Sequence, residues 1–113
     1  GLAVHMKLTP GIGLDAGAQL TAYRMVQEAL TNIAKYAQAG TVEISLVLER
    51  PMALLTVQDD GIGFDAAQAS GRSAHGLTGM RYRVESEGGM FEIDAAPGRG
   101  TRLSAWLPRR DPA

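Results

Sequence analysis

The longest regular pattern of hydrophobic and polar positions lies between residues 19 and 38, where the chain has neither glycine nor proline. At 100° per residue, six apolar residues of this segment fall on one side of a helix: Ala22, Val26, Ala29, Leu30, Ile33 and Ala37. Polar residues occupy the other side: Arg24, Glu28, Thr31, Asn32 and Lys35. We therefore predict an amphipathic helix that begins near Asp15, a residue type common at N-caps, and stops at Gly40.

Five shorter segments have the alternation or the composition of β-strands, namely residues 3–8, 41–49, 53–58, 90–95 and 101–107. Within 41–49, every second residue from Val42 to Leu48 is apolar and most of the others are polar, which predicts one buried face. Arg50 and Pro51 are typical of a hairpin turn, so the two strands that flank them should be antiparallel. Residues 96–100 predict a second hairpin turn.

The remaining segments complete the predicted architecture. A second helix should run from Gly76 to Gly88-Gly89, and its apolar residues are Leu77, Met80 and Val84. The small, polar residues 65–75 predict a mobile loop, and the tail from Pro108 is expected to fray. Four or five strands and two helices, not in strict βαβ order, predict an α/β two-layer sandwich in which both helices cover one face of a mixed sheet.

Length and composition predict one soluble domain over residues 1–113. Apolar residues make up 45% of the 113 residues, enough for a single modest core. A net charge of −1 offers no basic surface for nucleic acid, and no apolar run is long enough to span a membrane. The chain has no cysteine, which fits the cytoplasm. The abrupt start at Gly1-Leu2 leads us to expect a fragment of a longer protein, and whether that protein is anchored in a membrane is left open.

Candidate chemistry begins where the strand at 53–58 ends. Two carboxylates, Asp59 and Asp60, are followed by Gly61 and Gly63. A strand would deliver Asp59 to its end, and the glycines permit a sharp turn and the close approach of a ligand. Such a carboxylate is either a functional hydrogen-bond acceptor or an ordinary turn residue, because Asp-Gly is common in turns.

Four segments at the ends of the predicted elements carry a resemblance: the Glu28/Asn32/Lys35 helix face, 59–63, 76–80 and 98–101. In this order and spacing they resemble the asparagine box and the three glycine boxes of the ATP-binding domain of sensor histidine kinases, in the superfamily shared with gyrase-type ATPases. The resemblance covers about Tyr23 to Pro108, and 23–32 is similar to the nitrate-sensor and DesK subclass. It implies the Bergerat ATP-binding fold, with a mostly antiparallel sheet, and transfer of the γ-phosphate of ATP to a histidine.

The resemblance also implies roles for the helix face. Glu28, Asn32 and Lys35 should project toward a common point. We expect Asn32 to be the Mg²⁺ ligand, because an amide oxygen suits an ion that takes its other oxygens from phosphate and water. Lys35 is a candidate phosphate contact, while Glu28 is either a general base or an orienting group for the metal's water. Tyr36, also counted as ATP-binding, stands where the family usually has His. The alternative is a solvated helix face.

For the glycine segments, Asp59 matches the residue that reads adenine in this family. Its carboxylate would accept a hydrogen bond from the exocyclic amine, while Gly61 and Gly63 let the backbone approach the ring. The other predicted ATP-binding residues belong to the last two boxes: Gly76, Leu77, Gly79, Met80, Gly100 and Thr101. The first four begin a helix whose amides can meet phosphate oxygens, although Leu77 and Met80 also suit a core. The last two, with Gly98, would close the wall beside the base or form a plain hairpin turn.

Partners follow from what this segment lacks. The family carries its phosphoacceptor histidine on a helical dimerisation domain, and neither His5 nor His75 lies in such a setting. We therefore expect the chain to act on a separate acceptor domain of its own homodimeric parent protein, which would then serve a response regulator.

The sequence also has features of other functional classes. Residues 61–66 satisfy the G-x-G-x-x-A dinucleotide pattern, but no helical pattern follows them and two carboxylates would face the pyrophosphate. An anti-sigma-type serine kinase and a non-catalytic nucleotide-binding module of the same fold both stay open as alternatives.

Overall fold

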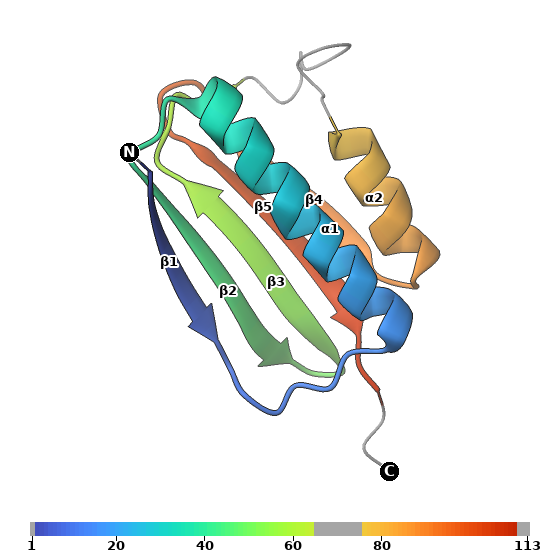
Figure 1. Ribbon diagram of the computed structural model, residues 1–113. Coiled ribbons are helices and arrows are strands. Elements are labelled where there is room, and N and C mark those ends of the chain that lie inside the picture. Colours follow the sequence, from blue (N-terminus) through green and yellow to red (C-terminus); the bar gives the residue numbers. More distant parts are fainter. Residues whose placement is uncertain (1, 65–75, 111–113) are drawn as a thin grey trace.

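The computed structural model describes residues 2–64 and 76–110, so the loop predicted at 65–75 lies outside the described residues. The elements are β1 (Ala3–Leu8), α1 (Ala16–Asn32), the π-helical turn η1 (Ile33–Ala37), β2 (Thr41–Glu49), β3 (Met52–Asp59), α2 (Leu77–Ser86), β4 (Met90–Ala95) and β5 (Thr101–Pro108). Figure 1 shows the strands in one five-stranded sheet of order β1-β2-β3-β5-β4. Only the β1–β2 pair is parallel within this sheet, and the other neighbours are antiparallel.

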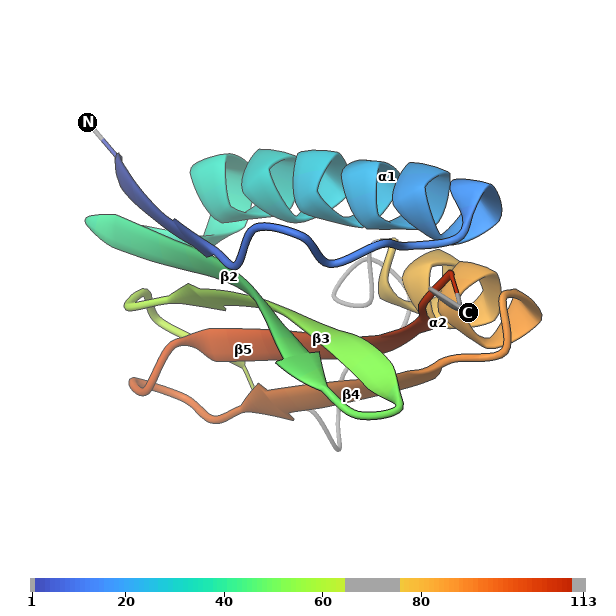
Figure 2. The ribbon, with the colours of Figure 1, turned by 90° about the horizontal axis from the view of Figure 1, so that it is seen from below.

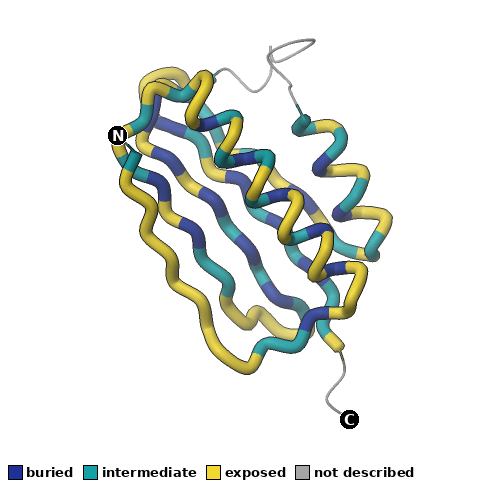
Figure 3. The backbone as a smooth tube through the Cα atoms, in the orientation of Figure 1, coloured by how far each residue is buried: buried dark blue, intermediate teal, exposed yellow. Residues whose placement is uncertain are grey.

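Both helices cover the same face of the sheet (Figure 2). Helix α1 packs on β3 and β5, and α2 packs on β4 and β5. Strand residues therefore alternate between buried and more exposed positions along β3 and β5, as Figure 3 shows. Val57 and Leu107, for example, are fully buried, while Gln58 is exposed. The predicted α/β two-layer fold with a mixed sheet is confirmed.

The buried stripe of α1 differs from the predicted one. The buried residues of α1 are Ala18, Thr21, Met25 and Ala29, and of these only Ala29 belongs to the predicted stripe. Four residues of the predicted stripe are only partly buried against the core, namely Ala22, Val26, Leu30 and Ala37. The reason is that the strands under α1 are β3 and β5, so the helix turns its Met25 side toward the sheet and keeps Val26 and Leu30 at the edge of the core.

The end of the first helix also departs from expectation. Helix α1 begins after Asp15, as predicted, but the Asp15 side chain makes no capping hydrogen bond. The last turn is the π-helix Ile33–Ala37, and Gln38 with φ of 53° ends it in the left-handed conformation. The chain therefore leaves the helix two residues before Gly40, the residue predicted to stop it.

Strand register places the polar strand ends together. Asp59, the last residue of β3, is paired with Thr101, the first residue of β5. At the other end of β5, Pro108 pairs with Met52 and Arg109 forms a bridge with Leu14. The expectation that the tail frays from Pro108 is therefore wrong for residues 108 and 109, because pairing with β3 and the segment before α1 holds them.

Among the described helices, none has the length and apolar character to cross a membrane.

Candidate functional site

A cavity of about 390 Å³ lies between the last turns of α1 and the end of the sheet where β3 stops and β5 starts. Its lining is mostly apolar, with a few polar groups: Ala29, Asn32, Ile33, Tyr36, Ala37, Val57, Asp59, Ile62, Gly63, Phe64, Leu77, Thr101 and Leu103. Small-molecule sites have this character, because apolar walls supply affinity and a few polar groups fix orientation. The cavity is therefore the candidate site.

Asp59 is the buried acid of this cavity, with 5% of its surface exposed. The Gly61 backbone N–H donates to its Oδ1 at 2.8 Å. Burial raises the pKa of the Asp59 carboxyl above its ordinary value of 3.8, and the nearby Asp60 charge adds to the rise, while the N–H groups of Gly61 and Thr101 oppose it. Backbone hydrogen bonds thus offset only part of the cost of burying this carboxylate beside an apolar cavity. A hydrogen-bond donor on a ligand would find a strong acceptor there.

Asp60 faces a different part of the chain. It is exposed, and its Oδ1 accepts hydrogen bonds from the backbone N–H groups of Gly40 at 2.9 Å and Thr41 at 3.0 Å. Hydrogen bonds from Thr41 and Gly40 lower the pKa of Asp60. Its role is to hold the start of β2, and it does not line the cavity.

Asp59→Asn is expected to stabilise the fold at neutral pH. Because the folded-state pKa is raised, the carboxyl contributes stability that is complete below pH 3.8 and is lost as the pH rises through the folded-state value. Asparagine keeps an oxygen for the Gly61 N–H and removes the ionisation. Thermal unfolding of both proteins should show the variant melting higher at neutral pH, with the advantage shrinking toward pH 3.8. A lower melting temperature of the variant at neutral pH would contradict this assignment.

Six of the predicted site residues lie together around the cavity: Asn32, Tyr36, Asp59, Gly63, Leu77 and Thr101. They come from α1, η1, β3, the turn after β3, the start of α2 and β5. Residues far apart in the sequence therefore converge on one space, as the four boxes implied.

Lys35 and Met80 are placed elsewhere. Lys35 is exposed and does not line the cavity. A π-helix advances each residue by a smaller angle than an α-helix, which turns Lys35 away from the Asn32 side and brings Tyr36 toward it. Met80 is 1% exposed and belongs to the hydrophobic core, so of the two residues that also suited a core, Met80 is core and Leu77 lines the cavity.

Glycines beside the cavity serve close backbone packing. A Cβ on Gly61 would lie 2.2 Å from the carbonyl oxygen of Ala37, and the Ile62 N–H donates to that same oxygen at 2.8 Å. A Cβ on Gly63 would lie 2.1 Å from the carbonyl oxygen of Ala96. Gly61 itself does not line the cavity. These glycines let the turn after β3 pass against η1 and the β4–β5 turn, which closes that end of the site.

Gly100 has the same function on the other side. It has φ of +72°, and a Cβ there would lie 2.2 Å from the carbonyl oxygen of Asp59. The lack of a side chain allows β5 to start directly beside the residue that carries the buried acid. Gly100 therefore supports the site from behind the cavity lining.

Glu28, Gly76 and Gly79 do not line the cavity, although Asn32 and Leu77, their neighbours on the two helices, do. Glu28 Oε2 forms an ion pair with Arg83 Nη1 at 3.1 Å, and a Cβ on Gly76 would lie 2.1 Å from Glu28 Oε1. Arg83 did not appear among the predicted site residues. No local signal marks it, because its partner is 55 positions away in the sequence.

The other residues that sequence reasoning missed are the apolar walls of the cavity: Ala29, Ile33, Ala37, Val57, Ile62, Phe64 and Leu103. Hydrophobic periodicity places several of these residues on the buried face of a helix or strand. It does not distinguish a face that packs against the core from one that lines a ligand site. An apolar residue beside a polar box, such as Ile62 between Gly61 and Gly63, is the available signal.

Comparison with known proteins agrees with this geometry. Residues 17–111 match the family described as histidine kinase-, DNA gyrase B-, and HSP90-like ATPase. The chain belongs to this family. The four boxes therefore lie within a segment that belongs to this family, and the cavity beside them is its candidate site.

Curated relatives are sensor kinases. The chain is 36% identical over 100 residues to sensor histidine kinase ComP of Bacillus subtilis, covering 85% of this chain and 13% of the relative. It is 38% identical over 97 residues to oxygen sensor histidine kinase NreB of Staphylococcus carnosus (86% and 28%). It is 37% identical over 97 residues to the histidine-protein kinase/phosphatase UhpB of Salmonella typhimurium (86% and 19%). The chain thus spans less than a third of each of these relatives, which are consistent with the predicted nitrate-sensor-like subclass.

Solved structures share the fold. The mycobacterial sensor histidine kinase MprB has a TM-score of 0.72 and 27% identity, covering 96% of this chain and 83% of that one. The blue-light activated histidine kinase of Erythrobacter litoralis EL346 has a TM-score of 0.77 and 22% identity, covering 95% and 35%. The second likeness concerns the fold alone. The predicted sensor-kinase ATP-binding domain is confirmed at the level of family and fold.

Proposed function

We propose that this chain binds Mg-ATP and donates the γ-phosphate to a histidine on a separate phosphoacceptor domain. The observation that carries the proposal is the buried Asp59, which lines a mostly apolar cavity together with Asn32 of α1. An adenine ring fits apolar walls, and its exocyclic amine is a donor that a carboxylate accepts. Asn32 would then lie on the phosphate side.

Magnesium fits the residues present. Asn32 lines the cavity and its side chain carries an amide oxygen, and Mg²⁺ usually combines one or two protein oxygens with phosphate oxygens and water. When bound, the ion would neutralise charge on the β- and γ-phosphates. The first turn of α2, from Leu77, would present its backbone N–H groups to phosphate oxygens. Lys35 is proposed as an outer phosphate contact that reaches in from the surface.

The transfer step exchanges one bond for another. The bond between the γ-phosphorus and the β,γ-bridging oxygen breaks, and a bond forms from the acceptor imidazole nitrogen to that phosphorus. ADP leaves with the electron pair of the broken bond. The attacking nitrogen is the unprotonated nitrogen of a neutral imidazole, and the proton on the other ring nitrogen passes to a base or to water. Glu28, one turn before Asn32 on α1, is the proposed base or orienting group for water on the metal.

The proposed partners follow from this reaction. The acceptor would be the dimerisation domain of a homodimeric sensor kinase in which residues 1–113 form a single ATP-binding domain, and a response regulator would receive the phosphoryl group next. A cytoplasmic location suits a domain that uses ATP. Neither nucleic acid nor direct contact with a membrane enters the proposal.

Titration calorimetry with Mg-ATP and a phosphotransfer assay test the proposal together. The chain alone is expected to bind Mg-ATP without labelling itself, because neither His5 nor His75 is proposed as acceptor. An acceptor domain of the parent kinase supplied in trans should become labelled, slowly because the covalent link no longer raises its effective concentration. Stoichiometric phosphohistidine on the chain alone would contradict the expectation, and binding without transfer to any acceptor would favour a non-catalytic module.

A further inference from the structure

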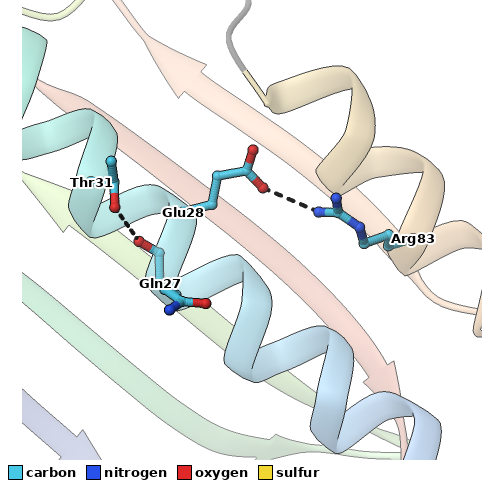
Figure 4. Close-up of polar contacts among 4 residues, drawn as sticks. All are labelled: Gln27, Glu28, Thr31 and Arg83. Atoms are coloured by element: carbon cyan, nitrogen blue, oxygen red, sulfur yellow. Dashed lines mark hydrogen bonds and ion pairs between the residues drawn. The ribbon is translucent and has the colours of Figure 1, made fainter.

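The Glu28 carboxylate is bound by Arg83 and lies against Gly76, at the start of α2. Its Oε2 accepts from Nη1 of Arg83 at 3.1 Å, and Figure 4 shows the Glu28 side chain extending from α1 across to α2. On the other side, a Cβ built on Gly76 would lie 2.1 Å from Oε1 and 2.6 Å from Cδ of Glu28. The carboxylate therefore fills the space that any side chain at position 76 would need.

Arg83 reaches this position because of its place on α2. It lies seven residues after Gly76, close to two full turns, so the two residues face the same side of the helix. Long side chains of a helix point back toward its N-terminus, and the path of Arg83 passes Gly79, where a Cβ would lie 3.9 Å from Nη2. One glycine thus makes room for Glu28, and the other borders the guanidinium that holds it.

Both α1 and α2 connect the ion pair to the lining of the cavity. Asn32 follows Glu28 by one turn of α1, and Leu77 follows Gly76 directly, and both of these residues line the cavity. We propose that Arg83 is a positioning residue, which fixes the Glu28 carboxylate in one orientation at the phosphate end of the site. This inference rests on the proposed function, because it assigns Arg83 a role through Glu28 in phosphoryl transfer.

The ion pair is too exposed to serve mainly as a stabilising brace between α1 and α2. The side chains of Arg83 and Glu28 are 39% and 33% exposed, and ion pairs with that much contact with water contribute little to stability. Buried side chains from both helices, among them Met25, Met80 and Val84, already belong to one core cluster. Loss of the pair should therefore release Glu28 without separating α1 from α2.

The test is Arg83→Gln, measured for thermal unfolding, Mg-ATP binding and phosphoryl transfer to the acceptor domain in trans. We expect an unchanged melting temperature, an ATP affinity within about threefold of wild type, and a transfer rate about ten- to hundredfold lower, because misorientation of a group in the reaction has effects of this size. Glu28→Gln should show the same fall. The double variant should lose no more than either single one, since both remove the same oriented carboxylate.

Two further variants separate positioning from bracing. Arg83→Lys keeps the charge and should restore part of the rate. The exchange of both charges, Glu28→Arg with Arg83→Glu, would restore a brace but leaves no carboxylate on α1, so transfer should stay low. Arg102→Gln is the matched control, because it removes an ion pair with Asp94 at 3.2 Å on a more exposed part of the sheet, and its transfer rate should equal that of wild type.

Three results would overturn the inference. Normal transfer by Arg83→Gln alongside a defective Glu28→Gln would show that Glu28 needs no such partner. Recovery of transfer in the charge-exchanged variant would show a brace. A wild-type chain that binds no Mg-ATP would refute the proposed function and this inference with it, whereas the first two results leave the proposed function intact.

Discussion

Asp59→Asn is expected to weaken ATP binding about ten- to hundredfold and to remove most of the preference for ATP over GTP. An ionised carboxylate only accepts hydrogen bonds, so it suits the amine at C6 of adenine and opposes the carbonyl oxygen that guanine presents there. The charge-assisted bond is worth roughly 1.5 to 3 kcal/mol, which gives that change in dissociation constant. Asparagine can turn its NH₂ group toward the guanine carbonyl, so GTP should lose less.

Calorimetric titration of wild type and variant with both nucleotides measures this effect. Asp60→Asn is the matched control, since Asp60 accepts from Gly40 and Thr41 and lies outside the cavity lining, so its affinities should equal those of wild type. Because burial raises the pKa of Asp59, wild-type ATP affinity should also begin to fall at a higher pH than an ordinary aspartate would give. Loss of binding in Asp60→Asn with normal binding in Asp59→Asn would mean that the other carboxylate reads the base.

Strands and hairpins were predictable because their signals are local. Residues 41–49 and 90–95 match β2 and β4 to the residue, since period-two alternation and flanking turn residues mark both ends. The convergence of the site was predictable only through the resemblance. Sequence spacing alone does not predict that Asp59 of β3 is paired with Thr101 of the neighbouring strand β5. This pairing is set by the register of the sheet.

The first helix shows where sequence reasoning reaches its limit. Apolar residue types predicted a stripe through Val26 and Leu30, but the helix buries Thr21 and Met25, because the buried side depends on which strands lie beneath it. Nothing in the composition of 33–37 distinguishes a π-turn from another α-turn. Tyr36 lines the cavity and Lys35 does not, and the smaller angle per residue of the π-turn adds to this difference.

Contacts between distant segments could not be predicted either. The pairing of Glu28 with Arg83 and the approach of Gly100 to the Asp59 backbone depend on side-chain and backbone positions that only the folded chain defines. The glycine boxes indicate that these positions require glycine, but they do not identify the group that each glycine faces. The structure supplies that answer: a carbonyl oxygen for Gly61, Gly63 and Gly100, and a carboxylate for Gly76.

Gly100→Ala is therefore expected to be strongly destabilising and to abolish tight ATP binding. Gly100 has φ of +72°, a conformation that costs a residue with a Cβ about 1–2 kcal/mol. The added Cβ would also lie 2.2 Å from the carbonyl oxygen of Asp59, and forcing atoms into a packed site costs about 1–3 kcal/mol more. Relief of this clash requires the end of β3 and the start of β5 to separate, which displaces Asp59 from the cavity.

Gly88→Ala separates the clash from the conformational cost. Gly88 has φ of +86°, but a Cβ there would meet nothing within 4 Å, so this variant should lose only the first term of about 1–2 kcal/mol. Denaturant unfolding and ATP titration of both variants give the comparison. Gly88→Ala should bind ATP with the wild-type affinity, since it lies beyond the end of α2 and outside the cavity lining. Equal destabilisation by the two substitutions would mean that the Asp59 backbone yields easily, and normal ATP binding by Gly100→Ala would mean that the position of Asp59 does not depend on the close approach of β5.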